Sequence, residues 1–153
     1  GLNCTTVLNG TLTNLHSWGN PNYQYVVWIP EFTLSTEQAR KALPKQYKKK
    51  DAVANLAYSI FMWEGLQGNP NVLKAGMNDT IHQPYRRKLI EEYDCLEQYV
   101  MNQGAYGFYI SGSGSSCLSV FPKETTVIPF TGKHKWNMVP VLPDTKGATW
   151  MKL

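Results

Sequence analysis

A glycine- and serine-rich stretch is the part of this sequence best suited to hold an anion. Residues 111–116 read Ser-Gly-Ser-Gly-Ser-Ser, so no side chain there is larger than serine. Because glycine adopts positive φ readily, successive backbone N–H groups can turn toward one anion, with the hydroxyls as further donors. The candidate donors are Ser111, Gly112, Ser113, Gly114 and Ser115. Taken alone the pattern is a weak signal, since such stretches more often form hairpin turns or flexible links.

Arg86 is the second candidate for binding an anion, because the sequence offers it no local partner. It has only apolar or aromatic residues three, four and seven positions after it, whereas Arg87 and Lys88 each have a glutamate four positions on. An unpaired arginine in the first turn of a helix is locally unfavourable unless an anion binds there. A carboxylate matches the planar guanidinium best. The alternative is an ion pair with an acid elsewhere in the fold.

Thr36, Arg40 and His82 complete the set of candidate site residues. The sequence Ser-Thr-Glu-Gln at 35–38 predicts a helix start with a capping box, and this places Thr36 and Arg40 on one helix face. Arg40 can contact the same anion as Arg86, or form an ordinary surface pair with Glu37. His82 precedes the helix that carries Arg86, so it is either a partner in that site or a structural histidine.

The elements that must position these residues form an alternating pattern. Strands are predicted over 11–15, 23–29, 106–110, 117–121 and 138–142, and a short helix or loop over 3–8. Helices are predicted over 36–43, 52–67, 71–78 and 84–103, the second capped by Asp51 and apolar almost all round, hence expected to be buried on several sides. This alternation predicts an α+β sandwich with helices on one face of a mainly antiparallel sheet.

Composition narrows the classes of partner. A chain of 153 residues with 42% hydrophobic content is expected to form one core. The basic run at 45–50 has little aromatic interleaving, so it indicates a solvated loop rather than a nucleic-acid site. No apolar run approaches the ~18 residues of a membrane span. Cys4, Cys95 and Cys117 are widely spaced, which favours a reducing, cytoplasmic location over a zinc site.

Three segments, in this order, resemble the C-terminal half of homoserine kinases, members of the GHMP superfamily of small-molecule kinases. The segments are residues 32–44, 79–86 and 104–116, and the similarity covers nearly the whole chain. The resemblance implies a ferredoxin-like sandwich of the GHMP kinase C-terminal domain type over residues 21–153. It also implies that residues 1–20 are a remnant of the N-terminal domain of such a kinase.

The resemblance implies roles for the candidate residues. Thr36, Arg40 and Arg86 match positions that hold L-homoserine, the arginines binding its carboxylate, and His82 belongs to the same motif. Asn3 resembles an asparagine that lines the substrate site. The glycine- and serine-rich stretch corresponds to a motif that supports the loop holding the phosphates of ATP. No catalytic residue and no metal ligand is assigned.

The activity implied by the resemblance is transfer of the ATP γ-phosphate to L-homoserine, a step toward threonine. In the family, a Pro-x-Gly-Leu-Gly-Ser-Ser phosphate loop and the acidic residue for Mg²⁺ lie in the N-terminal half, and this sequence contains neither. Phosphoryl transfer depends mainly on positioning the phosphates and the metal. We therefore expect this chain to be part of the enzyme, inactive alone, with ATP and Mg²⁺ bound mainly by the N-terminal half. A homodimer is included among the expected assemblies.

Two other interpretations stay open. The chain can be a stand-alone ferredoxin-like module that binds an amino acid or a small anion without catalysis, which the missing phosphate loop favours. It can also belong to a related GHMP kinase with another alcohol as substrate. Two arginines matching a carboxylate-binding pattern argue against the latter, because a substrate without a carboxylate would leave them unused.

Overall fold

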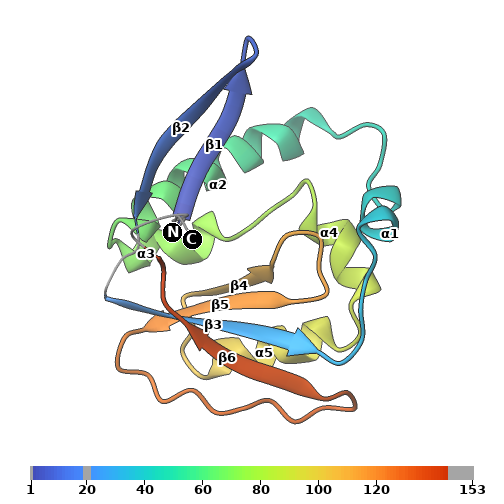
Figure 1. The fold of residues 1–153 in the computed structure, drawn as a ribbon, viewed down its shortest axis with the longest axis vertical. Helices are drawn as coiled ribbons and strands as arrows, with labels where there is room; N and C mark the ends of the chain where they lie inside the picture. Colours follow the sequence, from blue (N-terminus) through green and yellow to red (C-terminus); the bar gives the residue numbers. More distant parts are fainter. Residues whose placement is uncertain (1, 19–21, 145–153) are drawn as a thin grey trace, which may run out of the picture.

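Strands flank the glycine- and serine-rich stretch as predicted, and they belong to a four-stranded antiparallel sheet. The computed structural model describes residues 2–18 and 22–144. β3 (Tyr23–Pro30), β4 (Gly107–Ile110), β5 (Cys117–Pro122) and β6 (Trp136–Val141) lie in the order β4-β5-β3-β6. Counted along the chain this order is 2-3-1-4, as in a ferredoxin-like sheet, which confirms the predicted α+β class. β1 (Leu2–Leu8) and β2 (Thr11–Trp18) form a separate hairpin (Figure 1).

All helices of the described residues lie in the connection from β3 to β4. They are α1 (Thr36–Lys41), α2 (Lys49–Leu66), α3 (Pro70–Gly76), α4 (Gln83–Arg86), the 3₁₀ helix η1 (Arg87–Leu89) and α5 (Tyr93–Asn102). The helix or loop predicted over residues 3–8 is wrong. These residues form β1, which pairs with β2 from Leu2 opposite Trp18 to Leu8 opposite Thr11.

Both faces of the four-stranded sheet are covered. Side chains alternate along a strand, so Trp28 and Tyr25 of β3 point to opposite faces. Trp28 belongs to the core cluster that contains Leu96 of α5, and Tyr25 to the cluster that contains Leu73 of α3. The sequence predicts helices on one face of the sheet. In the structure α5 covers one face, and α3 with the end of α2 covers the other.

The single long helix predicted over residues 84–103 is wrong in its first half. After α4 and η1 the chain is extended at Ile90, and Glu92 has a φ of 61° before α5 starts. The Glu92 carboxylate accepts hydrogen bonds from the backbone N–H groups of Lys133 (2.5 Å) and His134 (2.9 Å). These bonds to a distant segment hold Glu92 outside the helix, and local helical spacing could not predict them.

The helix whose burial differs most from the prediction is α2. Its N-cap is Lys48, and Asp51 lies in the first turn rather than at the cap. The side chains of Val53, Leu56 and Ile60 are 57%, 69% and 68% exposed, although a buried helix is predicted. The C-terminal part of α2 packs against α3. Neither α2 nor another helix within residues 2–18 and 22–144 has the length and apolar composition that a membrane span requires.

His134 ties the loop before β6 to the turn before α5. Its Nε2 lies 2.8 Å from Oε2 of Glu91, and its Nδ1 lies 3.4 Å from Oε1 of Glu31. Lys133 Nζ also approaches Oε2 of Glu91, at 3.6 Å. The hydrogen bond between His134 and Glu91 raises the pKa of His134 and lowers the pKa of Glu91.

This contact predicts a pH-dependent contribution to stability. Because the pKa of His134 is raised in the fold, its contribution is complete below about pH 6.5 and is lost as pH rises through the folded-state pKa. The contribution of Glu91, whose pKa is lowered, is present above about pH 4.5 and is lost as pH falls. We expect His134→Gln to lower the midpoint of thermal unfolding most near pH 5 to 6, as measured across a pH series. Glu91→Gln should give the same profile, and a difference that grows above pH 8 would contradict the assignment.

Candidate functional site

The first turn of α1 brings Thr36 to the glycine- and serine-rich turn. Ser35 Oγ accepts from the N–H of Gln38 (3.1 Å) and Gln38 Oε1 accepts from the N–H of Ser35 (3.2 Å), which confirms the predicted capping box. This cap fixes where α1 begins, at the carboxyl end of β3. The hydroxyl oxygens of Thr36 and Ser113 then lie 3.3 Å apart.

Arg40 follows Thr36 by one helical turn and is exposed. The surface pair with Glu37 is not formed, because Oε1 of Glu37 binds Nζ of Lys41 at 2.6 Å. The side chain of Arg40 makes no ion pair or hydrogen bond with another residue of the described ranges. Its charge is therefore available to a ligand on the Thr36 side of α1.

The glycine- and serine-rich stretch is a hairpin turn between β4 and β5. Gly112 and Gly114 both have positive φ, 59° and 94°, as the sequence predicts. The turn is held by the N–H of Gly114 bonded to the carbonyl of Ser111 (3.1 Å) and by Ser115 Oγ, which donates to the carbonyl of Phe32 (2.9 Å). Within the described part of the chain, the N–H groups of Gly112 and Ser113 donate no hydrogen bond, so they are free to meet an anion.

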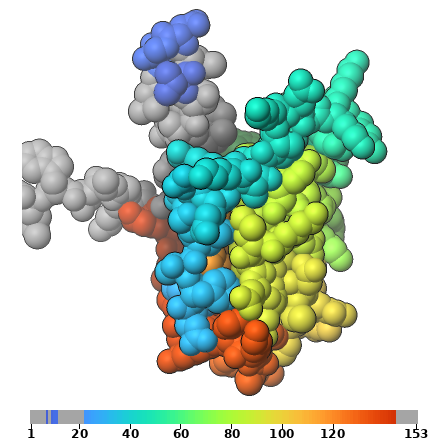
Figure 2. All heavy atoms as spheres, turned by 90° about the vertical axis from the view of Figure 1, so that its right-hand side faces the viewer, coloured from blue at the N-terminus to red at the C-terminus, as the bar shows by residue number. Residues whose placement is uncertain are grey.

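Arg86 lies against this turn and has no acidic partner among residues 22–144. Its Nη1 donates to the carbonyl of Gly112 at 3.0 Å, and its Nε is buried without a hydrogen-bond partner. A buried donor left unpaired costs free energy that a bound acceptor would recover. Figure 2 looks onto this face, where the segment around α1 and the segment of α4 and η1 lie beside each other.

The prediction that the start of the helix carrying Arg86 binds an anion is wrong. The N–H groups at the start of α4 are not free, because the Asp79 carboxylate accepts from Ile81 (2.6 Å), His82 (3.0 Å) and Gln83 (3.1 Å). With only four residues, α4 also has little dipole of its own. The guanidinium and the turn, rather than the helix, are the groups that can bind an anion.

No described side-chain contact joins the two remaining candidates to this cluster. His82 has its Nδ1 3.4 Å from Oδ2 of Asp79, with a side chain that is about half exposed, so its observed contact is a local one. The backbone of Asn3 lies in β1, and its side chain lies outside the described part of the structure. Asp79, which sequence reasoning missed, could have been found as a cap four residues before Gln83.

The arrangement suits binding of a carboxylate-bearing ligand. It offers the Arg86 guanidinium, whose buried Nε has no hydrogen-bond partner, two unbonded backbone N–H groups and the hydroxyls of Thr36 and Ser113. It offers no general base. No group of three or more His, Cys, Asp or Glu side chains able to hold a metal ion occurs among the described residues, so these residues do not fit Mg²⁺ by themselves.

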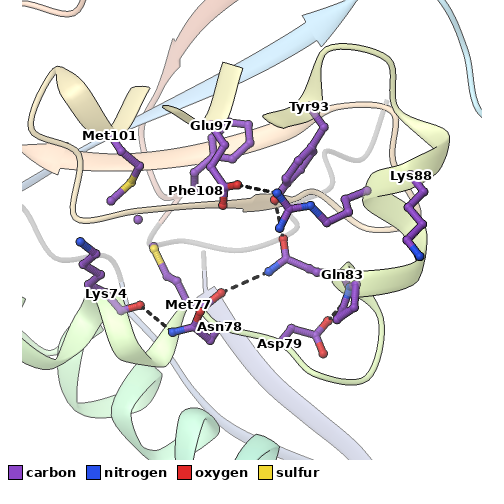
Figure 3. Close-up of a pocket in the computed structure, with 13 residues that line it drawn as sticks. Lys74, Met77, Asn78, Asp79, Gln83, Lys88, Tyr93, Glu97, Met101 and Phe108 are labelled. Atoms are coloured by element: carbon purple, nitrogen blue, oxygen red, sulfur yellow. Dashed lines mark hydrogen bonds and ion pairs between the residues drawn. The ribbon is translucent and has the colours of Figure 1, made fainter. Parts of the chain in front are cut away.

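A cavity of about 610 Å³ lies beside this cluster, and none of the predicted site residues lines it. Figure 3 shows Gln83, Tyr93 and Glu97 around it. Arg87 binds Asp94 (2.6 Å) and Glu97 (2.9 Å) instead of the predicted Glu91. Burial raises the pKa of Glu97 in spite of that pairing.

Gln83 connects the cavity to the turn. Its Oε1 accepts from the hydroxyl of Tyr93 (3.0 Å) and from the N–H of Ile110 (2.9 Å), the residue before the turn. Its Nε2 donates to the carbonyl of Met77 at 3.2 Å. Gln83 therefore fixes the end of β4, and with it the position of Gly112 relative to Arg86. No sequence signal marked this residue.

Replacing Gly114 by alanine should disturb the turn more than the same change at Gly112. A Cβ at Gly114 would lie 3.1 Å from Ile90 Cδ1 and 3.2 Å from Leu34 Cδ2, whereas one at Gly112 meets nothing within 4 Å. Both positions carry the cost of positive φ, and only Gly114 adds crowding. We expect Gly114→Ala to lower the free energy of unfolding in urea by about 1–3 kcal/mol more than Gly112→Ala. Equal losses would contradict the packing of the turn.

Comparison with protein families finds a match over part of the chain. Residues 62–129 match the family described as GHMP kinases C terminal. The match includes the end of α2, α3, α4, α5 and the hairpin of β4 and β5.

Comparison with individual proteins is consistent with this family. The chain is 46% identical over 100 residues to a homoserine kinase of Picosynechococcus, covering 65% of this chain and 33% of the relative. It is 37% identical over 126 residues to that of Crocosphaera subtropica, covering 81% and 41%. The crystal structure of homoserine kinase from Cytophaga hutchinsonii superposes with a TM-score of 0.70 at 28% identity, covering 74% of this chain and 36% of that one. The chain thus spans well under half the length of these relatives, and it matches their C-terminal part.

Proposed function

We propose that this chain, whose sequence and fold are those of a GHMP kinase C-terminal domain, is the C-terminal part of a homoserine kinase. The complete enzyme transfers the γ-phosphate of ATP to the side-chain hydroxyl of L-homoserine and forms O-phospho-L-homoserine, in threonine biosynthesis. The similarity to the curated relatives supports the reaction class. The contacts of Arg86 support a substrate that carries a carboxylate.

The observation that carries the proposal is the position of Arg86. It has no acidic partner in residues 22–144, its Nε is buried and unbonded, and its Nη1 is held by Gly112. A guanidinium that is held in place through Nη1 and still has a donor without a partner matches the planar shape of a carboxylate. Thr36 is joined to the same turn through Ser113. Three chain segments thus meet where one small amino acid would lie.

Each site residue then has a role in this proposal. Arg86 and Arg40 bind the carboxylate of L-homoserine, Thr36 contributes its hydroxyl, and His82 and Asn3 line the substrate site. The turn from Ser111 to Ser115 supports the phosphate loop of the N-terminal half. That half holds most of ATP together with Mg²⁺, for which the described residues offer no ligand cluster.

The division of the chain follows from the same proposal. Residues 21–153 form the C-terminal domain, and residues 1–20 belong with the N-terminal domain, in agreement with a β1–β2 hairpin that is separate from the four-stranded sheet. We propose that the 153-residue chain alone is inactive. A cytoplasmic location and a homodimer stay predictions.

The proposal is tested by binding to a chain of full kinase length. The N-terminal part of the Crocosphaera relative, up to the point where its match with this chain begins, is fused to this chain from the first matched residue onward. We call this protein the joined chain. Calorimetry compares L-homoserine with 3-amino-1-propanol, which lacks the carboxylate, and L-2-aminobutyrate, which lacks the hydroxyl. We expect L-homoserine to bind best and 3-amino-1-propanol worst. Preference for an unrelated ligand, with no heat from L-homoserine, would favour the stand-alone binding module.

A further inference from the structure

One face of α2 is apolar, uncharged and uncovered. Residues 52–63 contain no Asp, Glu, Lys or Arg. On this helix Val53, Leu56 and Ile60 are 57%, 69% and 68% exposed, and Phe61 is 40% exposed. Their spacing of three, four and one residues places them along one side of the helix. We call these four side chains the α2 face.

The rest of the described chain does not account for the α2 face. The other end of the helix packs on α3, where a Cβ at Gly65 would lie only 2.7 Å from the Leu73 Cα. Asn55 faces elsewhere, with its Oδ1 accepting from the N–H of Thr80 at 3.1 Å. A solvated helix face normally carries charges, and contiguous exposed apolar side chains mark a surface that another body covers.

We propose that the α2 face is the docking surface for the N-terminal, phosphate-loop half of the kinase; this inference rests on the proposed function. The chain covers 33% and 41% of the length of two relatives and matches their C-terminal part, so most of a kinase of that length lies outside this structure. The rest of such a kinase is large enough to bury the α2 face.

The position of α2 favours this occupant over a second copy of the chain. Residues 42–48 link α2 directly to α1, and within this link the ring of Tyr47 contacts that of Tyr85, with centroids 6.2 Å apart. Tyr85 precedes Arg86 in α4. A protein domain that covers the α2 face and extends along this link therefore reaches the segments that carry Thr36, Arg40 and Arg86, where the phosphate loop must lie. A second copy of this chain brings no phosphate loop.

The β1–β2 hairpin points to the same occupant. β1 and β2 pair only with each other among the described strands, and Figure 1 shows the hairpin and α2 above the four-stranded sheet. A two-stranded hairpin alone is marginal in water and leaves both edges open. The N-terminal half can cover this hairpin and the α2 face together.

Thiol accessibility tests the proposal without depending on activity. Leu56→Cys is introduced into the 153-residue chain and into the joined chain, and labelling by a maleimide is followed at that peptide by mass spectrometry. Ile128→Cys is the matched control, because Ile128 is 57% exposed in the segment between β5 and β6. We expect labelling at position 56 to be at least tenfold slower in the joined chain, and labelling at position 128 to be unchanged. Equal rates at position 56 in the two proteins would overturn the proposal.

A charge at the α2 face supplies a second readout. In the joined chain, Leu56→Glu should lower kcat/KM for L-homoserine at least tenfold, whereas Ile128→Glu should leave it unchanged. Both variants should unfold at the wild-type temperature in the 153-residue chain, which separates docking from folding. Protection of position 56 in the 153-residue chain alone, with sedimentation as a dimer, would assign the face to a second copy and overturn the proposal. Protection only in the joined chain, without phosphorylation of L-homoserine, would retain the docking surface and refute the proposed function instead.

Discussion

Arg86→Leu will weaken binding of L-homoserine to the joined chain about tenfold to a hundredfold. Charge-assisted hydrogen bonds contribute about 1.5–3 kcal/mol, and 1.4 kcal/mol corresponds to a factor of ten in the dissociation constant. The loss arises because the Nε of Arg86 is unbonded and its Nη1 is already fixed by Gly112. Calorimetry of the wild-type and variant joined chains measures the change.

The control for the Arg86→Leu variant is a substitution at Lys88, two residues along the chain. Lys88 is exposed and has the same charge, so Lys88→Gln removes a positive charge without touching the turn. We expect its dissociation constant for L-homoserine to stay within about twofold of wild type. Arg86→Lys should bind between the wild type and Arg86→Leu, because an ammonium keeps the charge but loses the planar fork. If Lys88→Gln and Arg86→Leu raised the dissociation constant equally, Arg86 would act only through its charge, which would contradict a direct contact with the carboxylate.

Trp28→Ala will lower the free energy of unfolding by about 3–5 kcal/mol, the cost of removing a large buried aromatic side chain. Trp28 is completely buried, and its Nε1 donates to Ser119 Oγ at 2.8 Å. The variant leaves a cavity between β3 and α5 and removes the donor to a buried hydroxyl. Urea unfolding of the 153-residue chain, analysed by linear extrapolation, measures the loss.

Two further variants separate the causes of this loss. Trp28→Phe keeps most of the ring volume and removes the N–H, so it should cost less than Trp28→Ala. Leu142→Ala, at a position 89% exposed, should change the free energy of unfolding by less than about 0.5 kcal/mol. A loss below 1 kcal/mol for Trp28→Ala would contradict the central position of Trp28 in the core.

Local signals predicted the elements whose cause is local. The aromatic and β-branched run at 23–29 predicted β3, and the Ser35–Gln38 capping box predicted the start of α1. Gly112 and Gly114 predicted a turn with positive φ, which the structure confirms. In each case the deciding interaction spans only a few residues, so the residue types contain it.

Interactions over long sequence distances decided the rest. Glu92 leaves the predicted helix because its carboxylate binds backbone N–H groups about forty residues on, at Lys133 and His134. The exposed α2 face could not be told from a buried one, because an apolar pattern does not say which body covers it. For Arg86, the lack of an i+4 acid could be predicted, but its partner is the carbonyl of Gly112, which no side-chain pattern reveals.

Formation of O-phospho-L-homoserine by the joined chain is the most direct test of the proposed function. ³¹P NMR follows the product in the presence of ATP, Mg²⁺ and L-homoserine, with the intact Crocosphaera relative as positive control and the 153-residue chain as negative control. We predict product with the joined chain, a marked decrease with Arg86→Leu, and none with the 153-residue chain. A folded joined chain that binds ATP but forms no product, while the intact relative does, would contradict the assignment of this chain as the C-terminal part of a homoserine kinase.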